Sequence, residues 1–323
     1  MPHHTLKSNA TTCHWGFFEA RRSAVLTVDS GDTVTIETLS GGPEVIPQTL
    51  NGASAFIVPP EMHEVHRDCA DRMLPGHILT GPVAVRGAKP GHVLEVRIKE
   101  VALRQDWGWN AIRPLSGALP NDFHQPRLLN IPLDRARNVG RLPWGLDLPL
   151  APFFGVMGVA PPTAWGRISS LPPRAHGGNL DNKELRAGAT LYLPVLVDGA
   201  NFSCGDGHAV QGDGEVCVTA VETALTGTFE LIVRTDLTFT YPRAETPTHL
   251  MTMGLHASLD VAAEMALRDM LVLLGETRGD KAGLSREDAY TLCSLAADLR
   301  VTQAVNGQKG IHCMIEKRWV GSA

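Results

Sequence analysis

The segment from residue 203 to residue 217, S-C-G-D-G-H-A-V-Q-G-D-G-E-V-C, gathers polar side chains and glycines in a way that an ordinary core segment does not. Glycines separate its polar residues, which are Asp206, His208, Gln211, Asp213 and Glu215. Glycine lets a backbone turn tightly or approach a ligand closely, while carboxylates and imidazole bind metals and move protons. The segment therefore predicts a metal-assisted active site on a glycine-rich loop between two strands.

A tight hairpin is the alternative interpretation of the same residues. The pairs Asp206-Gly207 and Asp213-Gly214 are strong hairpin signals, and turn chemistry would explain the glycines and both aspartates. It does not explain His208 and Glu215, so the active-site interpretation is favoured.

Composition excludes several classes of protein. The 323 residues suit one large domain or two closely packed ones, and hydrophobic residues at 43% with charged residues at 20% are typical of a globular protein. A formal net charge of −5 does not indicate the basic surface that nucleic-acid binding requires. The most apolar run, residues 270–274, is too short to cross a membrane. The six cysteines form no C-x-x-C pair, and the first ten residues lack the apolar core of a signal peptide. We therefore expect a cytoplasmic protein with free thiols.

Hydrophobic periodicity predicts the fold class. Short runs rich in valine, isoleucine, leucine and threonine predict strands at residues 24–28, 32–39, 93–101, 190–197, 215–222 and 228–237. Residues 105–173 are dense in proline, glycine and aromatic residues and predict an irregular but ordered stretch with buried aromatic rings. Apolar helical patterns predict helices at 258–274 and from Ser285, as N-cap, to about residue 304. We expect a mainly β fold, sandwich-like or barrel-like, with an α+β C-terminal third: a catalytic region 1–225, and a region 226–323 packed on it.

Other polar residues are weaker candidates for the site. His176 precedes two glycines, Asn179 and Asp181, which suits a loop ligand. His63 and His66 would share one helix face, but their spacing is not that of the H-E-x-x-H zinc motif, so a solvated helix or turn is favoured. His77 lies next to a strand, and His14, near the N-terminus, could also reach the site. Cys204 adjoins the glycine-rich segment, but a small buried cysteine is favoured over a nucleophile.

Four stretches resemble the acetamidase/formamidase family. They are G-D-G-H-A-V-Q-G-D-G-E-V-C (205–217), H-G-G-N-L-D-N-K-E-L (176–185), G-H-I-L-T-G-P-V-A-V (76–85) and L-S-R-E-D-A-Y-T-L-C-S-L-A-A-D-L-R-V-T-Q (284–303). The resemblance implies hydrolysis of a short carboxamide to carboxylate and ammonia, a bound divalent metal and a homo-oligomer, a dimer or larger. Val210 and Val218 stand where the resemblance leads us to expect alanine and glycine, which bears on the acyl pocket.

The motifs and the resemblance together assign roles. We expect Asp181, Asp206 and His208 to bind the metal, with His176 next. Glu215 is expected to act as general base and Gln211 to orient substrate or water. Zinc is expected because histidine is mixed with carboxylates, and calcium or another hard cation is the alternative. The residues expected to bind substrate are Asn179, Trp15, Trp107 and Trp109.

Two other functions compete with amide hydrolysis. One is a cupin-like β-barrel oxygenase or isomerase, in which two histidines and a carboxylate bind iron. The other is a β-protein that binds a small molecule or a metal without turnover. An ammonia-release assay over a panel of amides separates the three.

Overall fold

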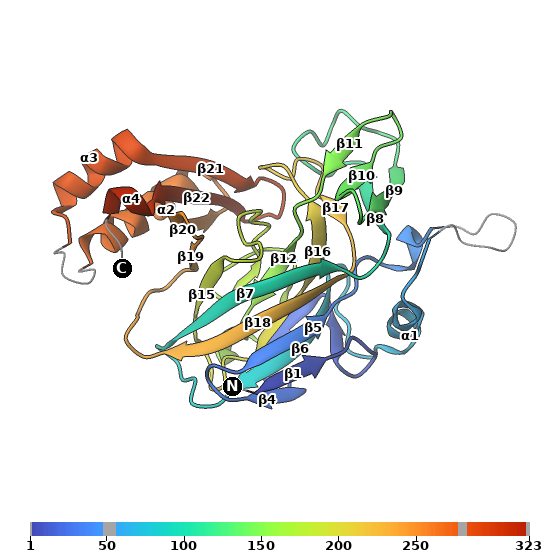
Figure 1. The fold of residues 1–323 in the computed structure, drawn as a ribbon, viewed down its shortest axis with the longest axis horizontal. Helices are drawn as coiled ribbons and strands as arrows, with labels where there is room; N and C mark the ends of the chain where they lie inside the picture. Colours follow the sequence, from blue (N-terminus) through green and yellow to red (C-terminus); the bar gives the residue numbers. More distant parts are fainter. Residues whose placement is uncertain (1, 48–55, 277–282, 321–323) are drawn as a thin grey trace, which may run out of the picture.

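The computed structural model describes residues 2–47, 56–276 and 283–320 (Figure 1). Over these ranges the strands form two large sheets and one two-stranded ribbon, β3 (Phe17–Glu19) with β13 (Arg167–Ser169). The expected mainly β fold class is confirmed. Within the same ranges, no helix is both long enough and apolar enough to span a membrane.

The first sheet has nine strands, and its two longest strands are neighbours that pair antiparallel (Figure 1). In spatial order its strands are β1 (His3–Leu6), β5 (Thr33–Glu37), β18 (Leu225–Arg234), β7 (Val93–Leu103), β15 (Thr190–Pro194), β19 (Arg243–Glu245), β20 (His249–His256), β22 (Lys309–Glu316) and β21 (Ala297–Gln303). The sheet therefore contains strands from both expected regions, 1–225 and 226–323. The division at residue 225 stays a prediction.

The second sheet has eleven strands, and Asp206, His208 and Asn179 lie on them. Its main path is β11 (Asp147–Pro149), β10 (Val139–Arg141), β9 (Arg127–Asp134), β8 (Trp107–Ile112), β17 (Val221–Glu222), β16 (Phe202–Val210), β12 (Phe153–Gly158) and β14 (Gly177–Asn179), and the remaining strands are β2 (Cys13–Trp15), β4 (Leu26–Val28) and β6 (Ile78–Val85). The glycine-rich motif is thus not simply a loop, because Asp206 and His208 lie within β16 and the loop begins after Val210.

The two sheets pack against each other through a shared apolar core. Phe154 on β12 and Phe202 on β16 come from the second sheet, and Phe229 on β18 comes from the first. The ring of Phe229 lies 5.4 Å from that of Phe154 and 5.7 Å from that of Phe202, between centroids. These contacts fix β16 and β12 against a rigid layer, which is the support that a precise polar site needs.

Helices pack against the strands of the first sheet that come from the C-terminal part of the chain (Figure 1). Helix α2 (Leu259–Gly275) ends at the expected glycine, and α3 (Arg286–Ala296) begins after Ser285, whose hydroxyl accepts from the Asp288 N–H. The expected continuation of α3 to residue 304 is wrong, because residues 297–303 form β21 and pair with β22. The short helices are η1 (Pro43–Val45), α1 (Pro60–Asp68), η2 (Thr163–Trp165) and α4 (Lys317–Val320).

Two further expectations need correction. Residues 215–222 are not one strand, since only β17 at the end of that run is extended. Residues 105–173 are not irregular, because they contain six strands, β8 to β13. Their aromatic residues divide into buried Trp107, Trp109, Phe153 and Phe154 and exposed Phe123, Trp144 and Trp165. Burial of an aromatic ring is a tendency that surface positions often violate, so apolarity alone could not separate the two groups.

Candidate functional site

The hydrogen bonds of His208 fix the direction in which its ring can bind a ligand. Its side chain is fully buried on β16, and Nδ1 lies 2.9 Å from the Gln211 Oε1 atom. The Gln211 Nε2 atom donates to the main-chain oxygen of Asp181 at 2.8 Å, so the amide oxygen must face the ring. The His208 Nδ1–H is therefore the donor to Gln211, and the Nε2 lone pair of the neutral ring points the other way.

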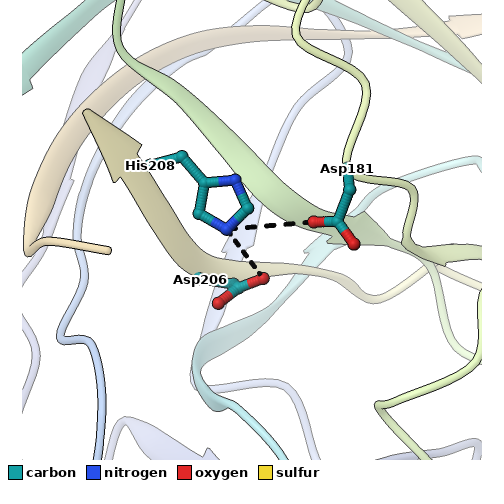
Figure 2. A group of neighbouring side chains, drawn as sticks. All are labelled: Asp181, Asp206 and His208. Carbon is teal, nitrogen blue, oxygen red and sulfur yellow. Dashed lines mark ion pairs between the residues drawn. The ribbon is translucent and has the colours of Figure 1, made fainter. Parts of the chain in front are cut away.

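Four buried carboxylates surround the Nε2 atom of His208. Nε2 lies 3.3 Å from Oδ2 of Asp206 and 3.3 Å from Oε1 of Glu222. It lies 3.9 Å from Oδ1 of Asp181 and 3.9 Å from Oε1 of Glu215. Figure 2 shows Asp181 and Asp206 pointing toward the ring from two different segments. These separations exceed a normal hydrogen-bond length of about 2.7–3.2 Å and leave room for a cation between the atoms.

The backbone is strained where three of these acids are held. Asp181, Asp206 and Glu215 have φ angles of 48°, 56° and 44°, in the left-handed region that side chains other than glycine rarely occupy. Each such residue costs on the order of 1–3 kcal/mol, and such strain is found at functional sites. Gly155 on β12 forms the floor of the cluster, because an added Cβ would lie 2.5 Å from oxygens of both aspartates.

Burial and mutual charge shift the pKa values of the groups in this cluster. Burial raises the pKa of Asp181, and burial together with the Asp181 charge raises the pKa of Glu215 well above its usual value. Burial also raises the pKa of Glu222 to about 7. Burial alone would lower the pKa of His208, but Glu222 and Asp206 raise it well above its usual value. Either a proton or a metal cation at Nε2 of His208 would be stabilised by the negative charge of the surrounding carboxylates.

Several buried polar atoms of the cluster are available to a ligand. Nε2 of His208, Oδ1 of Asp181 and Oε2 of Glu222 are buried and have no hydrogen-bond partner in the described structure. Two sets of groups have ligand atoms close enough to share an ion: Asp181, Asp206 and His208, and His208, Glu215 and Glu222. One imidazole nitrogen with several carboxylate oxygens fits zinc and also harder divalent cations.

A pocket of about 530 Å³ opens onto the cluster. Asp206, Glu215 and Glu222 line it, together with three of the four residues expected to bind substrate, Asn179, Trp15 and Trp109. Asn179 donates through Nδ2 to the Leu171 main-chain oxygen, while its buried Oδ1 has no hydrogen-bond partner among the described residues.

Some expected site residues lie elsewhere. Trp107 is fully buried, donates through Nε1 to the Ile57 main-chain oxygen at 3.0 Å, and is not among the residues that line this pocket. Gln211 uses both ends of its amide, one toward the His208 ring and one toward the Asp181 main-chain oxygen, and its expected role in orienting substrate or water stays a prediction. Asp213 forms an ion pair with Lys183 at 2.9 Å.

His176 is not brought into the acidic cluster. Its ring is fully buried against the edge of Phe18, with centroids 4.8 Å apart, and neither ring nitrogen has a partner among the residues described. Burial lowers the pKa of His176 to about 3, so the ring is neutral. The two acidic groups that could hold a metal do not include it.

The other histidines and the cysteine candidate also have definite places. His77 lines the pocket, with Nε2 3.7 Å from Oδ2 of Asp206, whereas His14 is buried beside Phe17. His63 is exposed on α1, and His66 bonds through Nε2 to the Gly41 main-chain oxygen at 3.0 Å. Cys204 is fully buried, and burial raises the pKa of its thiol, so it is not a reactive thiolate.

Sequence reasoning missed Glu222, Asn306 and Gly155. Glu222 faces His208 because the two residues are register partners of β17 and β16. Asn306 donates through Nδ2 to Oδ2 of Asp181 from a loop 125 positions away along the chain. Neither contact leaves a local pattern, and a glycine inside an apolar strand gives only a weak hint of close approach.

Comparison with known proteins finds relatives of this chain. A model of the Acetamidase/Formamidase family matches residues 23–165 and 163–314. A formamidase from Methylophilus methylotrophus is 30% identical over 191 residues, which are 43% of this chain and 47% of that protein. The matched stretches cover 47–56% of the three curated relatives, so the chain spans about half the length of the curated relatives it matches.

Solved structures match over nearly the whole chain. An acetamidase from Bacillus halodurans has a TM-score of 0.81 and 32% identity, covering 98% of both chains. A predicted acetamidase/formamidase from Thermoanaerobacter tengcongensis has a TM-score of 0.82 and 30% identity, covering 99% of this chain and 97% of that one.

Proposed function

The chain belongs to the acetamidase/formamidase family, and on that premise we propose that it hydrolyses the carbon–nitrogen bond of a carboxamide to a carboxylate and ammonia. The proposal is supported by the buried His208 Nε2 atom, which has no hydrogen-bond partner among the described residues and is faced by four carboxylates at the base of a pocket. Formamide and acetamide are the simplest substrates to test.

We propose that Asp181, Asp206 and His208 hold a divalent metal, with zinc favoured and calcium or another hard cation as the alternative. When bound, such a cation polarises a carbonyl and lowers the pKa of bound water. Gln211 keeps the His208 ring in the tautomer that presents Nε2. Asn306 holds the second oxygen of Asp181, which leaves Oδ1 directed at the cluster.

Glu215 is proposed as the general base. Its carboxylate lines the pocket and also lies beside His208, so it faces both the substrate and the metal ligands. It would take a proton from the attacking water and return it to the departing ammonia. Asn179, with its unpaired Oδ1 in the pocket wall, is placed to accept from the substrate amide N–H.

The chelation of metal tests this proposal directly. Protein dialysed against a strong chelator should stop releasing ammonia from acetamide and formamide, and a divalent cation should restore the rate. Full activity in protein shown to be metal-free would end the mechanism. An oxygenase with two histidine ligands is less well supported, because each of the two candidate metal groups among the described residues contains one histidine.

We also propose a cytoplasmic homo-oligomer, a dimer or larger. The oligomer rests on the family resemblance, and the location is compatible with six cysteines that are all free thiols. Light scattering at micromolar concentration tests the oligomer, and a monomer would contradict it.

A further inference from the structure

The pocket is much larger than formamide or acetamide, which have three and four non-hydrogen atoms. Its volume is about 530 Å³, whereas one water molecule occupies roughly 30 Å³ of the liquid. The acids of the cluster line its buried part, and Arg113, an exposed residue, lines its outer part. A substrate that fills this space must extend from the cluster toward solvent.

Two buried donors also line the pocket, on Trp109 and Ser40. Among the described residues, neither the Nε1–H of Trp109, which is 6% exposed, nor the hydroxyl of Ser40, which is 3% exposed, has a hydrogen-bond partner. Both line the pocket, and leaving a buried donor without a partner is unfavourable. The Arg113 guanidinium lies 5.8 Å from the centroid of the Trp109 ring and forms no ion pair with any described residue. Arg113, Trp109 and Ser40 thus offer donor groups that could bind an acceptor on a ligand.

A second cation strengthens the positive character of this wall. The Arg72 guanidinium lies 5.1 Å above the Trp15 ring, and Arg72 is held by the main-chain oxygens at the end of α1. Both rings and both arginines line the pocket. Outside the cluster, Glu44 is the one acidic residue among the described lining residues, so the outer wall carries two cations against one anion.

We propose that the preferred substrate is a carboxamide that carries a carboxylate at its other end. Arg113, Trp109 Nε1 and Ser40 would bind this carboxylate, and the indole faces of Trp15 and Trp109 would contact the carbon chain between. The inference rests on the proposed function. In the reaction, water adds to the amide carbon, the carbon–nitrogen bond breaks, and a dicarboxylate and ammonia leave. Succinamate, the monoamide of succinic acid, is a suitable probe.

Kinetics on matched amides test the carboxylate subsite. Succinamate should have a kcat/KM at least about tenfold above that of butanamide, which has the same number of carbons and no charge, because a hydrogen bond to a charged group is worth that factor. The Arg113→Gln variant should reduce this preference to near unity. Arg135→Gln removes an exposed arginine outside the pocket lining and should leave the preference unchanged.

Binding separates failure of this inference from failure of the hydrolase. Calorimetry should detect succinate binding to the full chain, weakened at least about tenfold by Arg113→Gln. Hydrolysis of acetamide without a succinamate preference and without Arg113-dependent succinate binding would overturn the subsite and leave the proposed function standing. Arg113-dependent succinate binding with no amide hydrolysis would uphold the subsite and refute the hydrolase. Absence of succinate binding would overturn the inference in either case.

Discussion

Replacing Gly155 with alanine would disturb the proposed metal site without removing any of its side chains. An alanine Cβ at this position would lie 2.5 Å from Oδ1 of Asp181 and from Oδ2 of Asp206, and 2.9 Å from Cε1 of His208. Real Cβ contacts are essentially never shorter than 3.0 Å, so both carboxylates must move by at least about 0.5 Å, the difference between 3.0 and 2.5 Å. The β12 backbone has little freedom to retreat, because it pairs with both β14 and β16.

The size of this movement sets the expected effect. Functional side chains must be held within about 0.5 Å of their working geometry, and misplacement by about 1 Å costs roughly 100-fold in rate. We expect Gly155→Ala to lower kcat on acetamide by about 10- to 100-fold and to weaken metal binding. Overpacking a buried strand should also lower the free energy of unfolding by about 1–3 kcal/mol.

Gly140 on β10 of the same sheet provides the matched control. An added Cβ there meets no atom closer than 3.5 Å, an ordinary van der Waals contact. Ammonia release, metal content by mass spectrometry after dialysis, and urea unfolding should be measured for both variants. If Gly155→Ala folds and keeps the metal content and rate of Gly140→Ala, then Asp181, Asp206 and His208 do not share a cation as argued.

Three further substitutions test separate parts of the argument. Glu215→Gln should lower kcat by roughly 10²–10⁴-fold with metal content retained, and a loss of metal with the rate would make Glu215 a ligand instead. Cys204→Ala should keep most activity because the thiol is buried with a raised pKa. A large loss of activity in this variant, together with an acyl-enzyme trapped on Cys204 of the unmodified protein, would instead show that the thiol is the nucleophile. Burial lowers the pKa of His176 from 6.5 to about 3. Between pH 6.5 and pH 3 this histidine therefore takes up a proton in the unfolded chain but not in the folded one. The free energy of unfolding should fall as the pH is lowered through this range. His176→Gln should reduce that slope by up to about 1.4 kcal/mol per pH unit in urea titrations, and an unchanged slope would contradict the buried neutral ring.

Local patterns in the sequence predicted the parts of the site that lie close together along the chain. Asp206, His208 and Glu215 fall within ten positions, and the glycines between them marked an unusual backbone. Glu222 escaped prediction because it meets His208 only through the pairing of β16 with β17. Register across a sheet is set by the whole fold, and alternation along one strand does not reveal the partner strand.

The errors in secondary structure have the same origin. Residues 297–303 follow α3 and contain enough apolar residues to fit a helix or a strand, since short runs are ambiguous in periodicity. Hydrogen bonding to β22 decides in favour of the strand. Trp107 and Trp109 lie on the same face of β8, yet only Trp109 reaches the pocket, and nothing in the pattern of alternation separates two positions on one face.

The strained backbone and the buried acidic side chains occur at the same three residues. Asp181, Asp206 and Glu215 each have a positive φ, and each carries a buried carboxylate beside the others. A fold selected for stability alone would avoid both costs, because left-handed backbone strain and like-charge burial act in the same unfavourable direction. A bound cation offsets the charge repulsion but leaves the strain unchanged, so the strain must be compensated by the rigid sheets beneath the cluster. Strand β16, packed through Phe202 against Phe229, provides that support and carries two of the proposed metal ligands. When residues adopt a strained backbone and bury charge, and the packed core offsets both costs, a functional role is the expected explanation.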